Sequence, residues 1–160
     1  MKVKKSILLA MLLLVPISAL AVDFSKVPLP DDLNIVPPDP SLPENIKALS
    51  GKRGGEWKAD TRFAAVIINS SVLVVEKILD EKTAVIVYGA SESSRSKAFF
   101  YRTEAQIISS GKRVKLEWVS PVTTRKITFH LRKDKLESEE PAGGVVETVT
   151  TISVTMSRIL

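Results

Sequence analysis

Apolar and polar residues alternate along much of the chain after residue 45. Between residues 113 and 118 the even positions are apolar and the odd positions are charged, and residues 126–132 alternate in the same way with the phase reversed. A period of two is typical of a β-strand that buries one face and leaves the other in water. We therefore predict two sets of residues on these strands: buried Val114, Leu116, Trp118, Ile127, Phe129 and Leu131, and exposed Lys115, Glu117, Thr128 and His130.

Further strands are indicated by alternation at residues 99–107 and by β-branched runs at 72–78 and 83–88. The runs have apolar side chains at successive positions, which predicts strands that are covered on both faces or lie centrally in the sheet. Short strands are predicted at 54–58 and 63–68 and a last, longer one at 145–156, which brings the count to about eight. Between them the sequence predicts tight turns at 79–82, 109–112 and 132–135 and a longer polar loop at 89–97.

Short turns between sequential strands favour one architecture for residues 46–160. Strands joined by hairpins in chain order form an up-and-down meander, and closing the meander into a barrel removes its unpaired edges. The predicted fold class is therefore all-β, a single small antiparallel up-and-down barrel. At 160 residues the chain is long enough for one domain with a hydrophobic core.

Residues 22–45 form a proline-rich segment ahead of the predicted barrel. Six of the eight prolines after residue 21 fall between Pro28 and Pro43, and each favours an extended conformation in the residue before it. One interpretation is a semi-rigid spacer. The other is a segment that lies along the barrel or docks into a partner, because it carries the apolar side chains Phe24, Val27, Leu29, Leu33, Ile35 and Val36.

Residues 1–21 have the pattern of a secretory signal peptide. Three lysines precede the apolar run 7–15, and an Ala-Leu-Ala cleavage site ends at Ala21. The apolar run is shorter than the roughly 20 residues that a membrane-spanning helix needs. We therefore predict cleavage and export across the inner membrane of a bacterial cell, to the periplasm or beyond. Removal of the three lysines lowers the formal net charge from +5 to +2, which argues against a nucleic-acid partner.

The residue types needed for common catalytic sites are scarce. The chain has no Cys and one His, which excludes disulfides, thiol catalysis and the usual multi-histidine metal site. His130 lies on the polar face of its predicted strand, where a solvated side chain is expected rather than a catalytic base. Two S-x-x-K matches, at 94–97 and 109–112, fall in predicted turns instead of opening a helix. We predict a protein without enzymatic activity, cofactor or metal ion.

The segment LSGKRGGEW at residues 49–57, followed by VLVVEKI at 72–78 and AVIVYG at 84–89, resembles the small calycin-like (lipocalin-like) β-barrel domains of bacterial proteins. In that family a G-x-W strand opens the barrel, and Trp57 completes this motif here. The resemblance implies that Arg158 in the last strand packs against the Trp57 ring and closes the barrel. The alternative is that Trp57 packs under the proline-rich segment while Arg158 is a frayed terminal charge. Arg53 departs from the family pattern, in which an apolar residue is usual.

Two functions are compatible with these observations. The first is a secreted, non-enzymatic barrel that binds a small apolar or amphipathic ligand, or a cell-envelope component, at its mouth. The second is a protein-interaction module of the cell envelope that docks a partner through residues 22–43. The strand pattern leaves open whether the interior is filled or hollow. The residues predicted to line an interior site are Phe99, Tyr101, Trp118, Phe129 and Met156.

Overall fold

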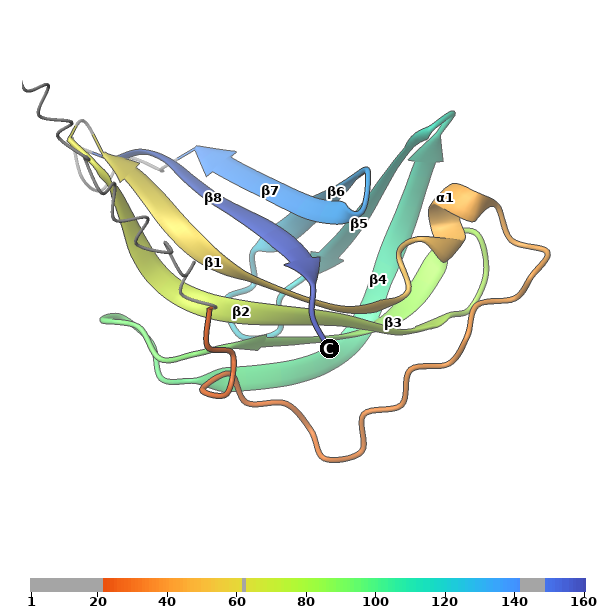
Figure 1. The fold of residues 1–160 in the computed structure, drawn as a ribbon, viewed down its shortest axis with the longest axis horizontal. Coiled ribbons are helices and arrows are strands. Elements are labelled where there is room, and N and C mark those ends of the chain that lie inside the picture. Colours follow the sequence, from red (N-terminus) through yellow and green to blue (C-terminus); the bar gives the residue numbers. More distant parts are fainter. Residues whose placement is uncertain (1–21, 62, 142–148) are drawn as a thin grey trace, which may run out of the picture.

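Eight antiparallel strands form a closed barrel in the computed structural model, which describes residues 22–61, 63–141 and 149–160 (Figure 1). Each strand pairs with the next along the chain, and β1 pairs with β8. The predicted all-β up-and-down barrel is confirmed. The signal peptide predicted at residues 1–21 lies outside the described residues. The strands are β1 (Gly51–Thr61), β2 (Ala65–Ile78), β3 (Thr83–Ala90), β4 (Phe99–Ser110), β5 (Arg113–Val119), β6 (Lys126–Arg132), β7 (Lys135–Pro141) and β8 (Val149–Arg158).

The individual strands differ from the predicted ones in two places. The predicted strands 63–68 and 72–78 merge into one strand, β2, which begins at Ala65, because the polar residues 69–71 between them keep pairing with β1. Polar side chains there interrupt the apolar pattern without interrupting the hydrogen-bonded ladder. β7 has the mainly polar sequence KLESEEP and is missing from the prediction. Residues 145–148 of the last predicted strand lie outside the described residues, and β8 continues to Arg158.

Side chains on β5 and β6 alternate between the barrel interior and the outer surface. Leu116 pairs with Phe129 across the two strands, and neither has any accessible surface. His130, on the opposite face of β6, is exposed. The predicted orientation of both strands is therefore confirmed, since a shift of one residue would exchange the faces. The rest of the predicted buried set follows, with Val114 and Trp118 buried and Ile127 and Leu131 partly buried against the core.

Glu117 corrects the prediction for the outer face, because it is buried instead of exposed. It projects outward from β5, yet only 8% of its surface is accessible. The Nζ atom of Lys115 lies 2.7 Å from its Oε1 atom, and Nζ of Lys126 lies 2.9 Å from Oε2. Hydrogen bonds from these ammonium groups lower the pKa of Glu117 to about 2. Lys115 and Thr128, also expected in water, are half-buried beside the same carboxylate.

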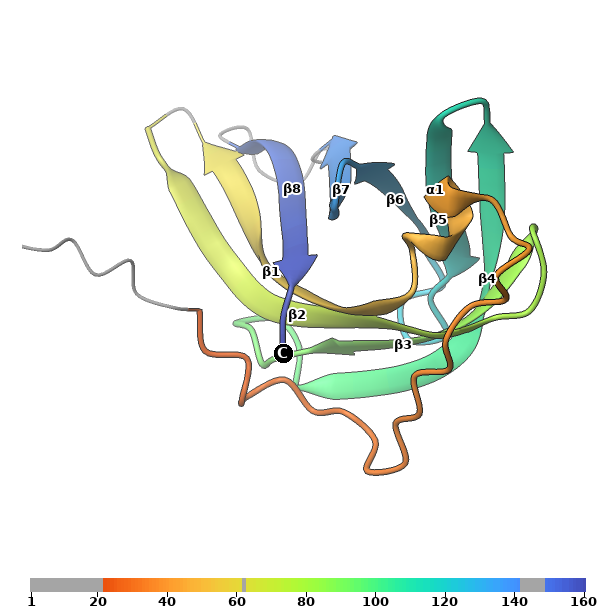
Figure 2. The same ribbon diagram turned by 45° about the vertical axis from the view of Figure 1, so that its right-hand side comes forward.

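A short helix plugs one end of the barrel (Figure 2). α1 (Glu44–Lys47) precedes β1, and Ile46 and Leu49 belong to the barrel core with 2% and 0% exposure. We call this the closed end; it also carries the turns at 79–82, 111–112 and 133–134. The opposite, open end carries the loop residues 63–64, 91–98 and 120–125. No helix in the described part of the chain is long and apolar enough to cross a membrane.

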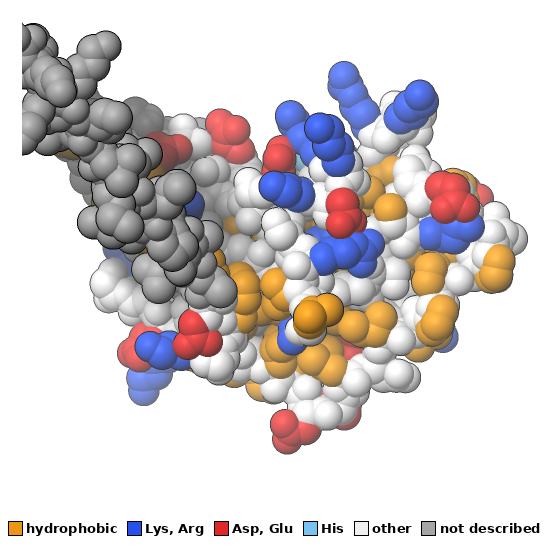
Figure 3. All heavy atoms as spheres, in the orientation of Figure 1, with side chains coloured by type: hydrophobic (Ala, Val, Ile, Leu, Met, Phe, Trp, Pro, Cys, Tyr) orange, Lys and Arg blue, Asp and Glu red, His pale blue; other side chains and the backbone are white. Residues whose placement is uncertain are grey.

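The proline-rich segment 22–43, which we call the arm, lies along the outside of the barrel. Val27 is 5% exposed and packs with Val72, Val74 and Val87 on the outer face of β2 and β3. These two strands thus have the core on one face and the arm on the other, which confirms that they are covered on both sides. In Figure 3, hydrophobic side chains gather along the lower part of the molecule, where the arm crosses it.

Glycine on the barrel surface allows the arm to approach closely. The ring of Phe24 lies over Gly54, where an added Cβ atom would come within 2.7 Å of the ring carbon Cζ. The carbonyl oxygen of Pro28 occupies the space that a side chain at Gly89 would need. Any larger residue at either position would collide with the arm, so these glycines are part of its binding surface.

Ion pairs fix the middle of the arm. Arg102 on β4 donates to Glu76 on β2 and to Asp32 of the arm, with an Nε–Oε2 distance of 2.8 Å and an Nη2–Oδ1 distance of 2.9 Å. The Glu76 carboxylate also accepts a hydrogen bond from the backbone N–H of Asn34. The hydrogen bonds from Arg102 lower the pKa of Asp32. The arm is docked on the barrel, so the interpretation as a free spacer does not describe this structure.

Candidate functional site

Six aromatic rings meet in the barrel interior. The rings of Trp118 and Phe129 stack with centroids 5.7 Å apart, and the edge of Trp57 meets the same Phe129 at 6.1 Å. Tyr88 lies 6.0 Å from Trp118 and 5.7 Å from Tyr101. These separations are in the range in which aromatic pairs stabilise a core beyond their buried area. The members of this aromatic cluster are Trp57, Tyr88, Phe99, Tyr101, Trp118 and Phe129.

Both indole N–H groups of the cluster donate to tyrosine hydroxyls within it. Trp57 Nε1 donates to the hydroxyl of Tyr88 at 2.8 Å, and Trp118 Nε1 donates to the hydroxyl of Tyr101 at 2.9 Å. Burial raises the pKa of Tyr101, which keeps its phenol neutral. A neutral hydroxyl that is paired with an indole N–H is suited to packing and apolar contact.

The structure brings four of the five predicted site residues together. Phe99, Tyr101, Trp118 and Phe129 all belong to the aromatic cluster. Met156 is fully buried in the same core but lies opposite Leu136 on β7, outside the ring contacts. Tyr88 and Trp57 complete the cluster. Tyr88 is absent from the predicted set, although its place at an inward position of β3 could have been inferred from the pairing of β3 with β4.

The barrel strands part toward the open end. β2 pairs with β3 only over Ser71–Ile78, so residues 65–69 have no described partner on that side. β4 pairs with β5 only from Gln106 onward, and the described pairs between β6 and β7 cover only residues 130–132 of β6. The wall is therefore continuous around the closed half and divided around the open half. Four of the six clustered rings are nevertheless 8% exposed or less, and only Trp57 and Phe99 are partly exposed.

Exposure changes with depth in the barrel. Phe129, Leu136 and Met156 have 0% accessible surface, which leaves no water-sized space beside them, so this half is filled. Trp57, Phe99 and Ile127 are only partly buried against the same core. We call these three side chains the floor, and the open end of the barrel beside them the mouth; neither of the two hollows described below lies there. The interior is thus filled below this floor.

One polar atom in the mouth lacks a hydrogen-bond partner. Asn69 on β2 lies directly opposite Trp57 on β1, and its Oδ1 atom is buried without a donor in the described part of the chain. A buried acceptor left unpaired costs about 1–3 kcal/mol, so a donor that reaches this oxygen would stabilise the folded protein. Asn69 therefore places an unpaired hydrogen-bond acceptor beside the apolar floor. Nothing in the alternation pattern distinguishes it from the neighbouring serines.

Two hollows in the described surface lie outside the barrel wall. The larger, of about 620 Å³, follows the seam between β1 and β8, where Gly54 and Gly55 carry no side chains. The smaller, of about 270 Å³, lies beside His130 on the outer face of β6, β7 and β8. None of the six clustered rings lines either hollow. Among the described residues, no three His, Cys, Asp or Glu side chains gather into a set that could hold a metal ion.

The expected contact between Trp57 and Arg158 is replaced by another arrangement. Arg158 lies opposite Arg53 in the pairing of β8 with β1, and Trp57 is four residues further along, about 13 Å at the rise of a β-strand. Arg158 donates from Nε to Asp134 at 2.8 Å and from Nη1 to the carbonyl oxygen of Ser50 at 3.1 Å. Arg158 thereby connects β8 to the β6–β7 turn and to the residue before β1. It contributes to the closure of the barrel through these contacts and not through the Trp57 ring.

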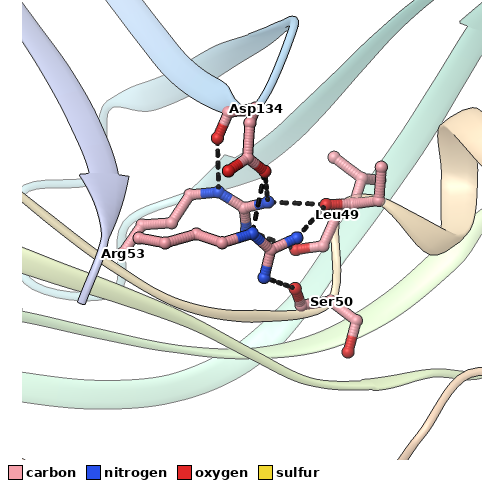
Figure 4. A network of polar contacts seen from close by, with 6 residues as sticks. Leu49, Ser50, Arg53 and Asp134 are labelled. Carbon is pink, nitrogen blue, oxygen red and sulfur yellow. Dashed lines mark hydrogen bonds and ion pairs between the residues drawn. The ribbon is translucent and has the colours of Figure 1, made fainter. Parts of the chain in front are cut away.

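Arg53 is fully buried beside this contact (Figure 4). Its Nη1 donates to the carbonyl oxygen of Leu49 at 2.7 Å, and its Nε donates to that of Asp134 at 3.3 Å. Burial and, to a smaller extent, the nearby Arg158 lower the pKa of Arg53 to about 10. Arg53 stands where calycin-like domains usually have an apolar residue. This difference singles out the position, but the sequence does not show what the buried guanidinium binds. The position is structural, because backbone groups of the closed end occupy its donors.

No family model, curated protein or solved structure matches this chain. The resemblance to calycin-like domains stays a prediction.

Proposed function

We propose that this chain is an exported, non-enzymatic binding protein that takes a small amphipathic molecule at the open end of its barrel. The observation that carries the proposal is the parting of the strands over the partly buried side chains of Trp57, Phe99 and Ile127. Three of the five hydrophobic side chains that are only partly buried against this core lie toward the open end, and the other two, Leu42 and Leu131, lie toward the closed end. Apolar floors with few polar groups are typical of small-molecule sites.

The chemistry of the mouth supports a ligand with one apolar and one polar part. Aromatic rings of the floor favour an acyl chain or a ring system. The unpaired Oδ1 atom of Asn69 favours a ligand that donates a hydrogen bond beside that apolar part. The filled closed half limits the depth of entry, so a large ligand would extend out of the barrel.

The alternative, in which the arm docks a protein partner, has less support. The arm buries Val27 and packs Phe24, Leu29 and Leu33 on the outer face of the barrel. These are the apolar side chains that a partner would have to bind, and they are already covered. Removing residues 22–43 should therefore weaken the barrel, whereas a dedicated docking arm could be removed without that effect.

A fluorescent probe tests the proposed mouth. The chain from Val22 is titrated with N-phenyl-1-naphthylamine, and energy transfer from tryptophan is recorded. Phe99→Ala should weaken saturable binding about tenfold, which corresponds to the apolar area that the ring offers. Phe100→Ala is the matched control, because Phe100 is the next residue on β4 and is 46% exposed on the outer face. Equal losses in both variants, or no saturable binding, would overturn the proposal.

A further inference from the structure

Three cations lie side by side on the outer face of the barrel, where β5, β6 and β7 reach the closed end. Arg132 pairs with Lys135 across β6 and β7. In the register of β5 with β6, the position before Val114 lies beside Arg132, and it holds Arg113. All three cations are exposed, and we call them the cationic row. Like charges directly opposite each other on neighbouring strands destabilise a sheet, so the fold alone does not account for the row.

The turns beyond the row add two lysines, Lys112 and Lys133. Residues 111–112 and 133–134 each connect a pair of strands, and the first residue of each turn, Gly111 or Lys133, has a φ of 58°. Glycine adopts this left-handed region readily, whereas a lysine is strained there. Lys133 therefore occupies a position where glycine would be the more stable choice. Like the row, this lysine adds positive charge and lowers the stability of the fold.

Positive charges outnumber negative ones over the whole closed end. Its described parts, residues 39–53, 79–82, 111–113, 132–137 and 158, contain ten Lys and Arg against six Asp and Glu. The excess is largest around the row, where residues 111–113 and 132–137 have five cations and two acids. Lys and Arg side chains project from the upper edge of the molecule in Figure 3, where Figure 1 shows the ends of these hairpins. Such a surface attracts anions.

The two acids beside the row already have cationic partners. The carboxylate of Asp134 accepts a hydrogen bond from Arg158 Nε at 2.8 Å, and Oε2 of Glu137 lies 3.2 Å from Arg132 Nε. Within the described residues, no ion pair joins the other four cations of the row and its turns to a carboxylate. These four are Lys112, Arg113, Lys133 and Lys135. They are free to bind an anionic group from outside the chain.

The shape and composition of this surface indicate the kind of anion that it fits. The row crosses three strands, so it is about 10 Å long at the usual spacing between strands. A polymer with anionic groups along its length can contact all three cations at once. Of the exposed large apolar side chains in the described chain, Leu79 and Ile108 lie at this end, and neither is aromatic. Insertion into a bilayer and stacking on bases both use apolar or aromatic groups, so the surface favours a polar polyanion.

From these observations we propose that the ends of the β4–β5 and β6–β7 hairpins bind an anionic polysaccharide. Arg113 and Lys135 contact successive anionic groups of the sugar chain, and Lys112 and Lys133 contact it beyond the row. Arginine can donate two parallel hydrogen bonds to such a group, and lysine acts as a point charge. Binding accounts for both unfavourable features, because the anion neutralises the repulsion within the row and pairs with the strained lysine. This surface is at the opposite end of the barrel from the mouth and does not depend on the ligand proposed there.

Heparin, a sulfated polysaccharide, is the probe that tests the proposal on the chain from Val22. Isothermal titration calorimetry should show saturable binding of heparin and no binding of uncharged dextran. An increase in NaCl from about 0.1 to 0.3 M should weaken heparin binding about tenfold or more, because several cations contact the polymer. Saturating heparin should leave the probe titration of the mouth unchanged.

Variants of the row separate binding from stability. Arg113→Thr/Lys135→Thr should weaken heparin binding about tenfold, while the midpoint of urea denaturation stays the same or rises, because threonine favours strands and the repulsion is removed. Lys133→Gly should weaken binding about threefold and raise the midpoint, because glycine relieves the strain at a φ of 58°. The matched control is Arg95→Thr/Lys97→Thr, which removes the same two charges from an exposed loop at the open end.

An absence of saturable heparin binding would overturn the proposal directly. Unchanged binding in Arg113→Thr/Lys135→Thr would show that the row does not contact the polymer. An equal loss of binding in Arg95→Thr/Lys97→Thr would show that net charge, and not the row, attracts heparin. Displacement of heparin by the same concentration of negative charge on duplex DNA, or on vesicles of phosphatidylglycerol, would assign the surface to another class of anion.

Discussion

Arg53 and Arg158 lie opposite each other on β1 and β8, and both guanidinium groups donate to the carbonyl oxygen of Ala48. The carboxylate of Asp134 faces both of them, at 3.7 Å from Arg53 Nη2 and 2.8 Å from Arg158 Nε. Two like charges can share this seam because backbone carbonyl groups and one carboxylate surround them. The pair joins the first strand, the last strand, the β6–β7 turn and the plug helix at a single point.

Arg53 should therefore matter more to stability than Arg158. Arg53→Ala leaves buried carbonyl groups unpaired and should reduce the free energy of unfolding by about 3–5 kcal/mol. Arg158 is half-exposed, and Arg158→Ala should cost about 1 kcal/mol. Urea denaturation of the two variants measures both values. Equal losses would show that the buried guanidinium has no special role.

Gly89→Ala should loosen the arm from the barrel. The added methyl group meets the carbonyl oxygen of Pro28, so the arm must shift, at a cost of about 1–3 kcal/mol. A double-mutant cycle with a chain that lacks residues 22–43 isolates this cause. In the shortened chain Gly89→Ala should cost little. A loss of the same size in both backgrounds would place the collision within the barrel itself.

The stability contributed by Glu117 should disappear in acid. Its pKa is about 2 in the folded protein against an ordinary 4.5, so the unfolded chain takes up a proton first as the pH falls. The contribution is complete above pH 4.5 and is lost as the pH approaches 2. The difference in melting temperature between the wild type and Glu117→Gln should shrink over that window. Glu104→Gln, an exposed change on β4, is the control, and a constant difference across the window would contradict the assignment.

Trp118 should be among the most costly positions to truncate. It is 4% exposed and contacts both Tyr88 and Phe129, so Trp118→Ala should reduce the free energy of unfolding by about 3–5 kcal/mol. Tyr101→Phe keeps the ring but removes the hydroxyl that accepts the Trp118 Nε1 proton and bonds the Ser120 side chain, and it should cost about 1–3 kcal/mol. Chemical denaturation compares the two. A smaller loss in Trp118→Ala than in Tyr101→Phe would mean that the ring is not packed as described.

The alternation of residues predicts the strands and their faces because it follows from the geometry of one strand at a time. Leu116 and Phe129 are inside for that reason. β7 is not predicted because it lacks the alternation of apolar and polar residues. A strand can be mainly polar when its neighbours supply most of the core. Glu117 is buried because two lysines cover it, which depends on a cross-strand neighbour as well as on its own position.

The contacts between distant strands could not be predicted in the same way. Alternation gives the face of Trp57 and of Arg158, but the stagger between β1 and β8 decides whether they meet, and it places Arg158 beside Arg53 instead. The apolar side chains of the arm indicate contact with a surface, yet the sequence offers no means to choose between the barrel and a partner. Gly54 and Gly89 receive the arm, and their role is visible only once its path is known.

The seam between the first and last strands also sets the order in which the chain can fold. Neighbouring hairpins close loops of a few residues, whereas Arg158 and Ala48 are 110 positions apart, and such distant contacts form late because closing the intervening loop is entropically unfavourable. The contact between Asp32 and Arg102, which is 70 positions further along the chain, should form late for the same reason. A chain that emerges with its N-terminus first therefore presents the arm and β1 before their partners exist. Folding is completed only after β8 has been synthesised, and a chain that stops before β8 leaves the whole outer edge of β1 without a strand to pair with.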